Sequence, residues 1–159
     1  MGDSAGRMPD DGYCERLVPQ APERFAALMR TKTFTNGADC ELVIHLYTST
    51  LNSVLSAAPR LTMRKNAHWG DEDMRALVEV LPLCAEATEL DLFRSFMKAT
   101  EEGMAVLTGT VKAGKLPPKL KRIKLDGLSD SWGRFRGSDC AKDLRAACML
   151  QGIELEGSV

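Results

Sequence analysis

The chain lacks the sequence features that most directly indicate membrane insertion, export or an anionic partner. Its longest apolar runs are only a few residues, so we expect no transmembrane helix and no membrane insertion. The opening MGDSAGRMPDDG contains acidic side chains and no apolar stretch, which predicts neither a signal peptide nor a transit peptide. Gly6 stands where N-myristoylation requires Ser or Thr. A net charge of −1 gives no general attraction to polyanions, so no nucleic-acid partner is expected.

Cysteine and histidine are too few and too scattered to predict a disulfide framework or a metal site. The five cysteines are widely spaced, odd in number and without a C-x-x-C pair. They predict reduced thiols in the cytoplasm, with the nucleus as the alternative compartment. His45 and His68 have no second ligand nearby in the sequence. We therefore expect neither a metal nor another cofactor.

Motifs of known enzyme classes are absent as well. The chain contains no nucleophile elbow, Walker loop, zinc-protease motif or glycine-rich dinucleotide motif. Carboxylates do cluster at residues 71–73 and 101–102, but acidic side chains at the start of a helix are explained by capping and by the helix dipole. The expectation is that the chain is not an enzyme and has no catalytic residues.

What the sequence does contain is a spaced pair of apolar residues that returns four times. The pairs are Leu61/Met63, Leu90/Leu92, Ile123/Leu125 and Ile153/Leu155, at intervals of 29, 33 and 30 residues. A period of this size is typical of stacked-repeat proteins. Each of the first three pairs precedes a polar loop and an amphipathic helix. Asp71, Thr100 and Ser138 are expected to cap these helices.

The chain divides into three segments. Residues 1–20 are rich in Gly, Pro and Asp and predict a mobile arm. Residues 21–58 predict an N-terminal cap made of a helix starting near Pro22, a first strand and a short helix. The strand is predicted for residues 40–47, where apolar side chains alternate with others. Residues 59–159 hold the repeat units, and the fourth unit consists of a strand without a cap.

Within the repeats, LKRIKL and LQGIEL fit the pattern L-x-x-L-x-L, and ATELDL fits it with Ala87 in the first place. The helical halves DEDMRALVEVL and EEGMAVLTGTV are similar to those of ribonuclease-inhibitor-like leucine-rich repeats. The resemblance extends over residues 59–155, although only Asn66 occupies the family's asparagine position. It implies an α/β fold: a short, curved leucine-rich-repeat solenoid with parallel strands on the concave face and helices on the convex face.

Alternate residues of the strands carry charges that change sign from one unit to the next. Because neighbouring strands lie about 5 Å apart, we expect Glu89 to fall between Arg60 and Arg122, and Lys124 to lie beside Glu154. Two interpretations stay open: the charges neutralise one another as solvated ion pairs, or they form a concave binding face.

The loops that leave the strands bring aromatic and arginine side chains to one rim of the repeat stack. Exposed Trp, Phe and Arg together are typical of protein interfaces. The alternative is that the rings fold back and fill the space between strands and helices. If the first interpretation holds, at least two of Trp69, Phe96, Trp132 and Phe135 are exposed in the isolated chain.

A basic run between Lys112 and Lys124 is the third candidate surface. It coincides with the turn between a helix and the next strand, where cations are favourable without any ligand. A solvated turn and a docking patch for an acidic partner both remain open.

These observations predict a protein–protein interaction or scaffold module that binds a protein partner through the rim and the concave face. The alternative is a small accessory subunit built permanently into a larger assembly, with a neighbour covering the edge of the fourth unit. The identity of the partner does not follow from the sequence. The candidate partner-binding residues are Arg64, Trp69, Phe93, Arg94, Phe96, Lys124, Trp132, Arg134, Phe135 and Arg136.

Overall fold

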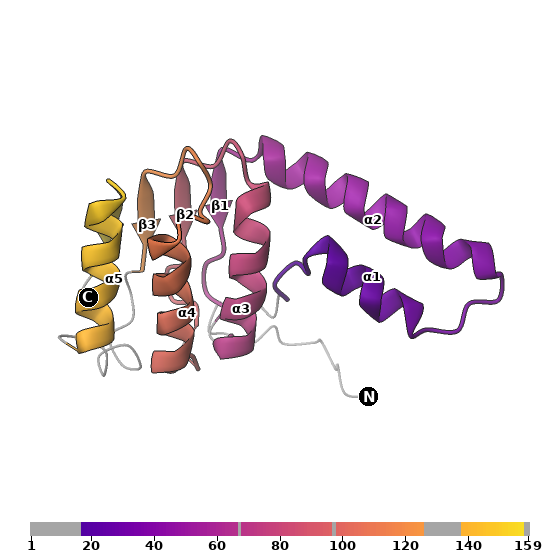
Figure 1. Cartoon of the computed structure of the whole chain (residues 1–159), viewed down its shortest axis with the longest axis horizontal. Helices are drawn as coiled ribbons and strands as arrows, with labels where there is room; N and C mark the ends of the chain where they lie inside the picture. The colour runs from indigo at the N-terminus through magenta and orange to yellow at the C-terminus, as the bar shows by residue number, and fades with distance from the viewer. Residues whose placement is uncertain (1–16, 67, 97, 126–137, 158–159) are drawn as a thin grey trace, which may run out of the picture.

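The structure is a computed structural model that describes residues 17–66, 68–96, 98–125 and 138–157. Within these ranges the fold is mixed α/β. Most of the predicted N-terminal arm lies outside them. The elements in chain order are α1 (Pro22–Arg30), α2 (Gly37–Ala57), β1 (Arg60–Thr62), α3 (Asp71–Val80), the 3-10 turn η1 (Leu81–Leu83), β2 (Glu89–Asp91), α4 (Glu101–Lys112), β3 (Arg122–Lys124), α5 (Asp139–Leu150) and β4 (Glu154–Glu156) (Figure 1).

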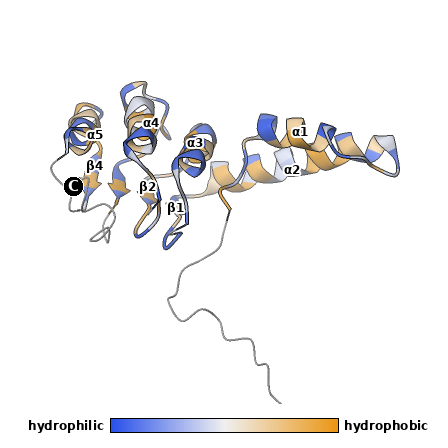
Figure 2. Cartoon of the chain, turned by 90° about the horizontal axis from the view of Figure 1, so that it is seen from below, coloured by the Kyte–Doolittle hydropathy of each residue, from blue (hydrophilic) through white to orange (hydrophobic). Residues whose placement is uncertain are grey.

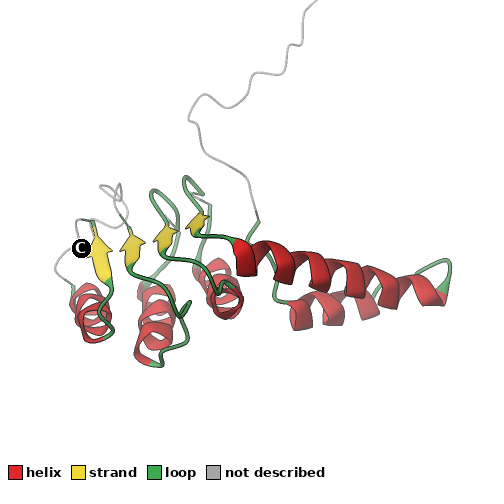
Figure 3. Ribbon diagram, turned by 90° about the horizontal axis from the view of Figure 1, so that it is seen from above, coloured by secondary structure: helices red, strands yellow, loops and turns green. Residues whose placement is uncertain are grey.

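The four strands form one parallel sheet in the order of the chain. β1 pairs with β2, β2 with β3 and β3 with β4. Parallel neighbours require a crossover between them, and α3, α4 and α5 lie in these connections or beside them. The helices cover one face of the sheet, with α3 packed on α4 and α4 on α5 (Figure 3). The predicted alternation of strand and helix in residues 59–156 is therefore confirmed.

The core lies between the strands and these helices. The central residue of each of the first three strands, Leu61, Leu90 or Ile123, is buried, while its neighbours face the other side of the sheet. Leu77 and Leu107 come from the facing sides of α3 and α4 and are fully buried. Each repeat thus contributes one apolar strand position and one helix stripe to a continuous core.

The strand predicted for residues 40–47 is wrong. These residues belong to α2, a helix of 21 residues that packs against α1 and extends beyond the edge of the sheet (Figures 1 and 3). Asn36, expected to form a turn, is the N-cap, and its side chain accepts a hydrogen bond from the Ala38 amide (3.2 Å). The apolar residues of 40–47 alternate as in a strand, but Ile44 is also at helical spacing from Leu51 and Leu55, which face the same side of α2. Alternation over eight residues therefore does not distinguish a strand from this helix.

The fourth unit is shifted by two residues from the alignment of the apolar pairs. Leu155 lies opposite Ile123, where Ile153 was expected. A shift of two keeps every side chain on its predicted face, because side chains alternate along a strand. Glu154 therefore lies opposite Arg122, and Glu156 lies opposite Lys124.

The helix starts differ from expectation at one position. Thr100 and Ser138 cap α4 and α5 as predicted, accepting from the amides of Glu102 and Ala141. The N-cap of α3 is Gly70, however, and Asp71 is the first helical residue.

The Asp71 carboxylate instead accepts hydrogen bonds from the start of the neighbouring helix, α4. Its Oδ1 accepts from the amides of Thr100 (2.7 Å) and Gly103 (3.0 Å), and its Oδ2 accepts from the Thr100 hydroxyl (2.7 Å).

Candidate functional site

The face of the sheet that α3, α4 and α5 do not cover carries the predicted ladder of charges. We call it the open face; its side chains come from the outer positions of the four strands. Glu89 lies between Arg60 and Arg122 as expected, with its Oε1 3.3 Å from Arg60 Nε and its Oε2 3.8 Å from Arg122 Nη1. Lys124 Nζ lies 3.3 Å from Glu89 Oε1 and 3.7 Å from Glu156 Oε2. The neighbour of Lys124 on the fourth strand is therefore Glu156 and not Glu154.

Arg122 is the most heavily paired cation of the open face. Its Nε donates to Glu154 Oε2 at 2.9 Å and lies 3.7 Å from Glu156 Oε2. This hydrogen bond, followed by the charges of Glu154, Glu156 and Glu89, raises the pKa of Arg122 above its usual value. The open face thus satisfies much of its own charge, which favours the ion-pair interpretation over a face held ready for a ligand.

The loops that leave β1 and β2 are joined to each other along one edge. We call this edge the strand-exit rim, defined by residues 63–66, 68–70, 92–96 and 98–100. The Lys65 amide donates to the Phe93 carbonyl (2.8 Å), and the Phe96 amide donates to the Asn66 carbonyl (3.3 Å). The Ser95 hydroxyl accepts from the Asn66 amide (3.2 Å) and donates to the Met63 carbonyl. Each loop therefore holds its neighbour in place.

Two of the predicted rim aromatics are buried. Trp69 is 1% exposed and Phe96 is fully buried, and their rings pack edge to face with centroids 5.0 Å apart. They fill the space between loops and helices, so they do not contact a partner directly. His68, half-buried, lies edge-on to Trp69 with the ring centroids 6.4 Å apart. Trp132, Arg134, Phe135 and Arg136 lie outside the described residues.

Among the phenylalanine and tryptophan side chains in the described part of the rim, Phe93 is the one that is partly exposed. It is half-buried, and two guanidinium groups lie over its ring: that of Arg64 at 4.7 Å from the centroid and that of Arg94 at 5.5 Å. Arg64 Nε also lies 3.5 Å from Asp91 Oδ2. Arg94 is exposed and has no ion pair among the described residues. The structure thus brings together three of the predicted site residues, Arg64, Phe93 and Arg94.

The backbone of the rim is held in a conformation that most side chains avoid. Lys65 has a φ of 61°, Arg94 a φ of 55° and Phe96 a φ of 59°. Such left-handed conformations cost about 1–2 kcal/mol for residues with a Cβ atom, and they concentrate at functional loops. Lys65 and Arg94 occupy the same place in successive units, one residue before Asn66 and Ser95. Lys65 was not among the predicted site residues; its place opposite Arg94 in the repeat was the available signal.

The basic run is largely paired with neighbouring units. Lys119 Nζ lies 2.6 Å from Glu86 Oε2, and Lys112 Nζ lies 3.7 Å from Asp143 Oδ2. In the described part of the chain, Lys115 and Lys121 have no ion pair. Most of this run therefore joins adjacent repeats, which favours the interpretation as a solvated turn.

Groups suited to catalysis or metal binding are sparse in the described residues. Burial raises the pKa of Cys84 and of Cys148 to about 11, so both thiols stay protonated and poorly nucleophilic near neutral pH. Within the described ranges, no cluster of three or more His, Cys, Asp or Glu side chains could hold a metal ion. Among the helices of those ranges, none combines the length and apolarity needed to cross a membrane.

Comparisons of the chain with protein-family models, with curated proteins and with solved structures found no match.

Proposed function

We propose that the chain is a protein-binding or scaffold module, built as a short leucine-rich-repeat solenoid of the ribonuclease-inhibitor-like type. The period of apolar pairs, the sequential parallel strands and the helices on one face support this assignment. In such a solenoid the open face is concave and the rim lies beside it. The partner is a protein that contacts the rim and the adjoining part of the open face.

The observation that carries the proposal is the cluster of Arg64, Phe93 and Arg94. Aromatic residues and arginine are enriched in protein interfaces, and tryptophan, tyrosine and arginine are enriched among the few residues that contribute most of the binding energy. Phe93 is pre-positioned, because its carbonyl is tied to Lys65 and its ring lies against two guanidinium groups. A cluster fixed before binding loses less conformational freedom on binding.

An affinity capture from the native source tests this role. The bait is the whole chain, compared with a Phe93→Ala, Arg94→Ala variant and with a matched Lys32→Ala, Phe34→Ala control in the loop between α1 and α2. We expect a partner that wild type and control retain and the rim variant loses. A partner retained by all three proteins would exclude the rim as its binding site.

A second candidate role is that of an accessory subunit in a larger assembly. Met149 and Leu150 at the end of α5 are 74% and 85% exposed, close to the outer strand β4. Large apolar side chains at this level of exposure are typical of a surface that a neighbour covers. A Met149→Lys, Leu150→Lys variant that leaves the native complex intact would exclude this role.

A further inference from the structure

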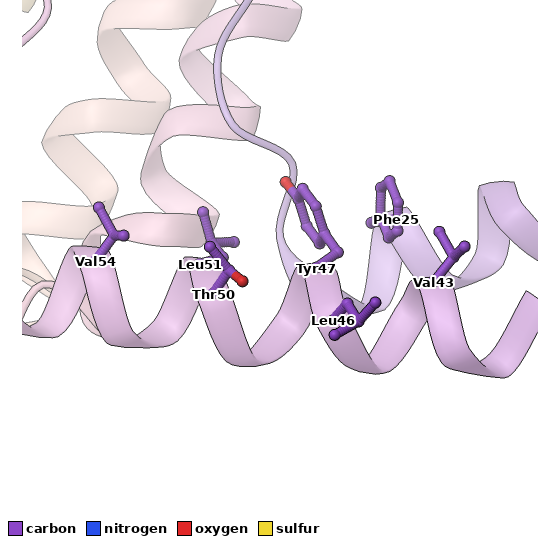
Figure 4. Close-up of a pocket in the computed structure, with 7 residues that line it drawn as sticks. All are labelled: Phe25, Val43, Leu46, Tyr47, Thr50, Leu51 and Val54. Carbon is purple, nitrogen blue, oxygen red and sulfur yellow. The ribbon is translucent and has the colours of Figure 1, made fainter.

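Helix α2 presents an apolar groove that is independent of the rim. Figure 2 shows apolar residues along much of this helix. The groove has a volume of about 560 Å³ and is lined by Phe25 of α1 and by Val43, Leu46, Tyr47, Thr50, Leu51 and Val54 of α2 (Figure 4). Leu46 is 55% exposed and Val54 is 61% exposed. Ile44 and Leu55 are buried and lie beside Leu51 on the helix, so the apolar arc of α2 continues from the side that the body of the protein covers into the groove.

The floor of the groove is fixed in place. The rings of Phe25 and Tyr47 lie side by side (Figure 4). They stack with centroids 3.7 Å apart and an interplanar angle of 16°. The Tyr47 hydroxyl donates to the carbonyl of Gln20 at 2.8 Å. Tyr47 therefore cannot turn to close the groove without breaking a hydrogen bond and a ring stack. A groove of this kind is available for binding without rearrangement.

The spacing of the lining residues is the same from either end of the helix. Along α2 they follow one another at intervals of three, one, three, one and three residues. A second copy of α2 laid antiparallel on the groove therefore places Val43 against Val54, Leu46 against Leu51, and Tyr47 against Thr50. The two-fold axis passes between Thr48 and Ser49. This is the self-complementary arrangement that a symmetric dimer requires, in which the same patch serves both subunits.

The charges of α2 favour the same arrangement. Its carboxylates, Asp39 and Glu41, lie near its N-terminus, and no Asp, Glu, Lys or Arg follows from residue 42 to residue 57. A soluble surface is designed with charges on about 25–35% of its residues, and residues 42–57 have none. An antiparallel copy brings each acidic end beside the C-terminal end of the other copy's helix, and Arg60, which also pairs with Glu89, follows that end in the sequence. A parallel copy would instead bring the two Asp39 carboxylates together, whereas Glu41 is already hydrogen-bonded to Arg30 of its own chain (3.2 Å).

We propose that α2 is a dimerisation helix, which binds α2 of a second copy of this chain in an antiparallel, two-fold arrangement. The apolar groove and Phe25 form the buried centre of the interface. The acidic ends of the two helices lie outside it. None of the residues of the strand-exit rim lines the groove, so the dimer presents two rims.

Sedimentation equilibrium of the full chain over a wide concentration range tests the dimer. Wild type is expected at twice the chain mass of 17.4 kDa. Leu46→Glu places a charge at the centre of the groove and is expected to sediment at the mass of one chain. Leu42→Glu is the matched control, because Leu42 lies on the same helix with the same 55% exposure but does not line the groove. A monomeric wild type, or equal effects of the two substitutions, would overturn the proposal.

A charge exchange tests the antiparallel arrangement. Val43→Glu and Val54→Lys are each expected to weaken the dimer as single variants. In the double variant each glutamate faces a lysine of the other copy, so the dimer is expected to return. Far-UV circular dichroism shows whether each variant is folded. A folded double variant that stays monomeric would overturn this arrangement, as would loss of the dimer in the Met149→Lys, Leu150→Lys variant.

Discussion

Replacing Asp71 with alanine removes a carboxylate of α3 that accepts hydrogen bonds from the first turn of α4. In wild type this side chain accepts from two amides and one hydroxyl of residues 100–103, at 2.7–3.0 Å. Loss of a helix cap costs about 0.5–2 kcal/mol, and hydrogen bonds to a charged group are worth about 1.5–3 kcal/mol. Because Asp71 is half-buried and water partly replaces it, we expect unfolding free energy to fall by about 2 kcal/mol. For a chain of this size the melting temperature should fall by about 4–8 °C.

Urea denaturation followed by circular dichroism measures this loss. Asp139→Ala is the matched control: Asp139 is likewise the first residue of its helix, but its side chain is 99% exposed and pairs only with Lys142 among the described residues. That substitution should change the unfolding free energy by less than about 0.5 kcal/mol. If the two substitutions cost the same, the bonds between helices contribute nothing and the reasoning is refuted.

The same contact predicts the behaviour of Gly103. A Cβ atom at this position would lie 2.4 Å from Asp71 Oδ1, whereas a Cβ at Gly109 of the same helix meets nothing within 4 Å. Gly109→Ala should therefore stabilise the chain by about 0.5–1 kcal/mol through helix propensity. Gly103→Ala should destabilise wild type, and its cost should shrink in the Asp71→Ala background. Additive effects would show that the two residues are not coupled.

The pH dependence of this contact has a defined sign. Burial raises the pKa of Asp71, but the hydrogen bonds from Thr100 and Gly103 and the charge of Arg75 outweigh burial and hold it below the usual value of 3.8. A lowered pKa in the folded state stabilises the fold above the unfolded pKa. That contribution is lost as the pH falls through the folded pKa. The stability difference between wild type and Asp71→Asn should therefore shrink below about pH 4.

Two further predictions concern the rim and the open face. Trp132→Phe leaves Trp69 as the single tryptophan; because Trp69 is buried, its fluorescence should be blue-shifted and poorly quenched by acrylamide, and a quenchable, red-shifted emission would contradict its packing. Glu89→Gln removes the carboxylate shared by Arg60, Arg122 and Lys124, and should cost about 1–3 kcal/mol of unfolding free energy. Glu154→Gln, in a more exposed ion pair, should cost less than about 1 kcal/mol; equal costs in urea denaturation would contradict the central role of Glu89.

The sheet and its covering helices were predictable because each repeat places one apolar residue at the same point of the core. Leu61, Leu90 and Ile123 are such residues, and their spacing alone indicates strands that pair in order. The register of the fourth strand was predicted wrongly because Ile153 and Leu155 both pack against the core. Either residue could therefore lie opposite Ile123, and the apolar pattern does not decide between these two registers. Helix α2 was missed because a window of eight residues accommodates both periods; the pattern over residues 43–55 is helical.

The candidate site was less predictable, because the backbone of the rim turns in a way that propensity does not reveal. A residue with a left-handed backbone changes the direction of the chain, so aromatic side chains before and after it can point to different sides. The backbone at Arg94 and at Phe96 is left-handed, and across this segment Phe93 stays partly exposed whereas Phe96 is buried. Composition identified the aromatic residues of the rim but not which of them face solvent.

The carboxylate of Asp71 also gives the repeat stack an order of assembly. The start of α3 is closed from within, since the Gly70 amide donates to Asp73 Oδ2 at 2.8 Å. The start of α4 is completed only when α3 is in place. The first turn of α3 therefore needs no other helix to complete it, whereas the first turn of α4 depends on docking to α3. Because a chain leaves the ribosome N-terminus first, the first helix is ready as a template when the second emerges, and folding can follow synthesis.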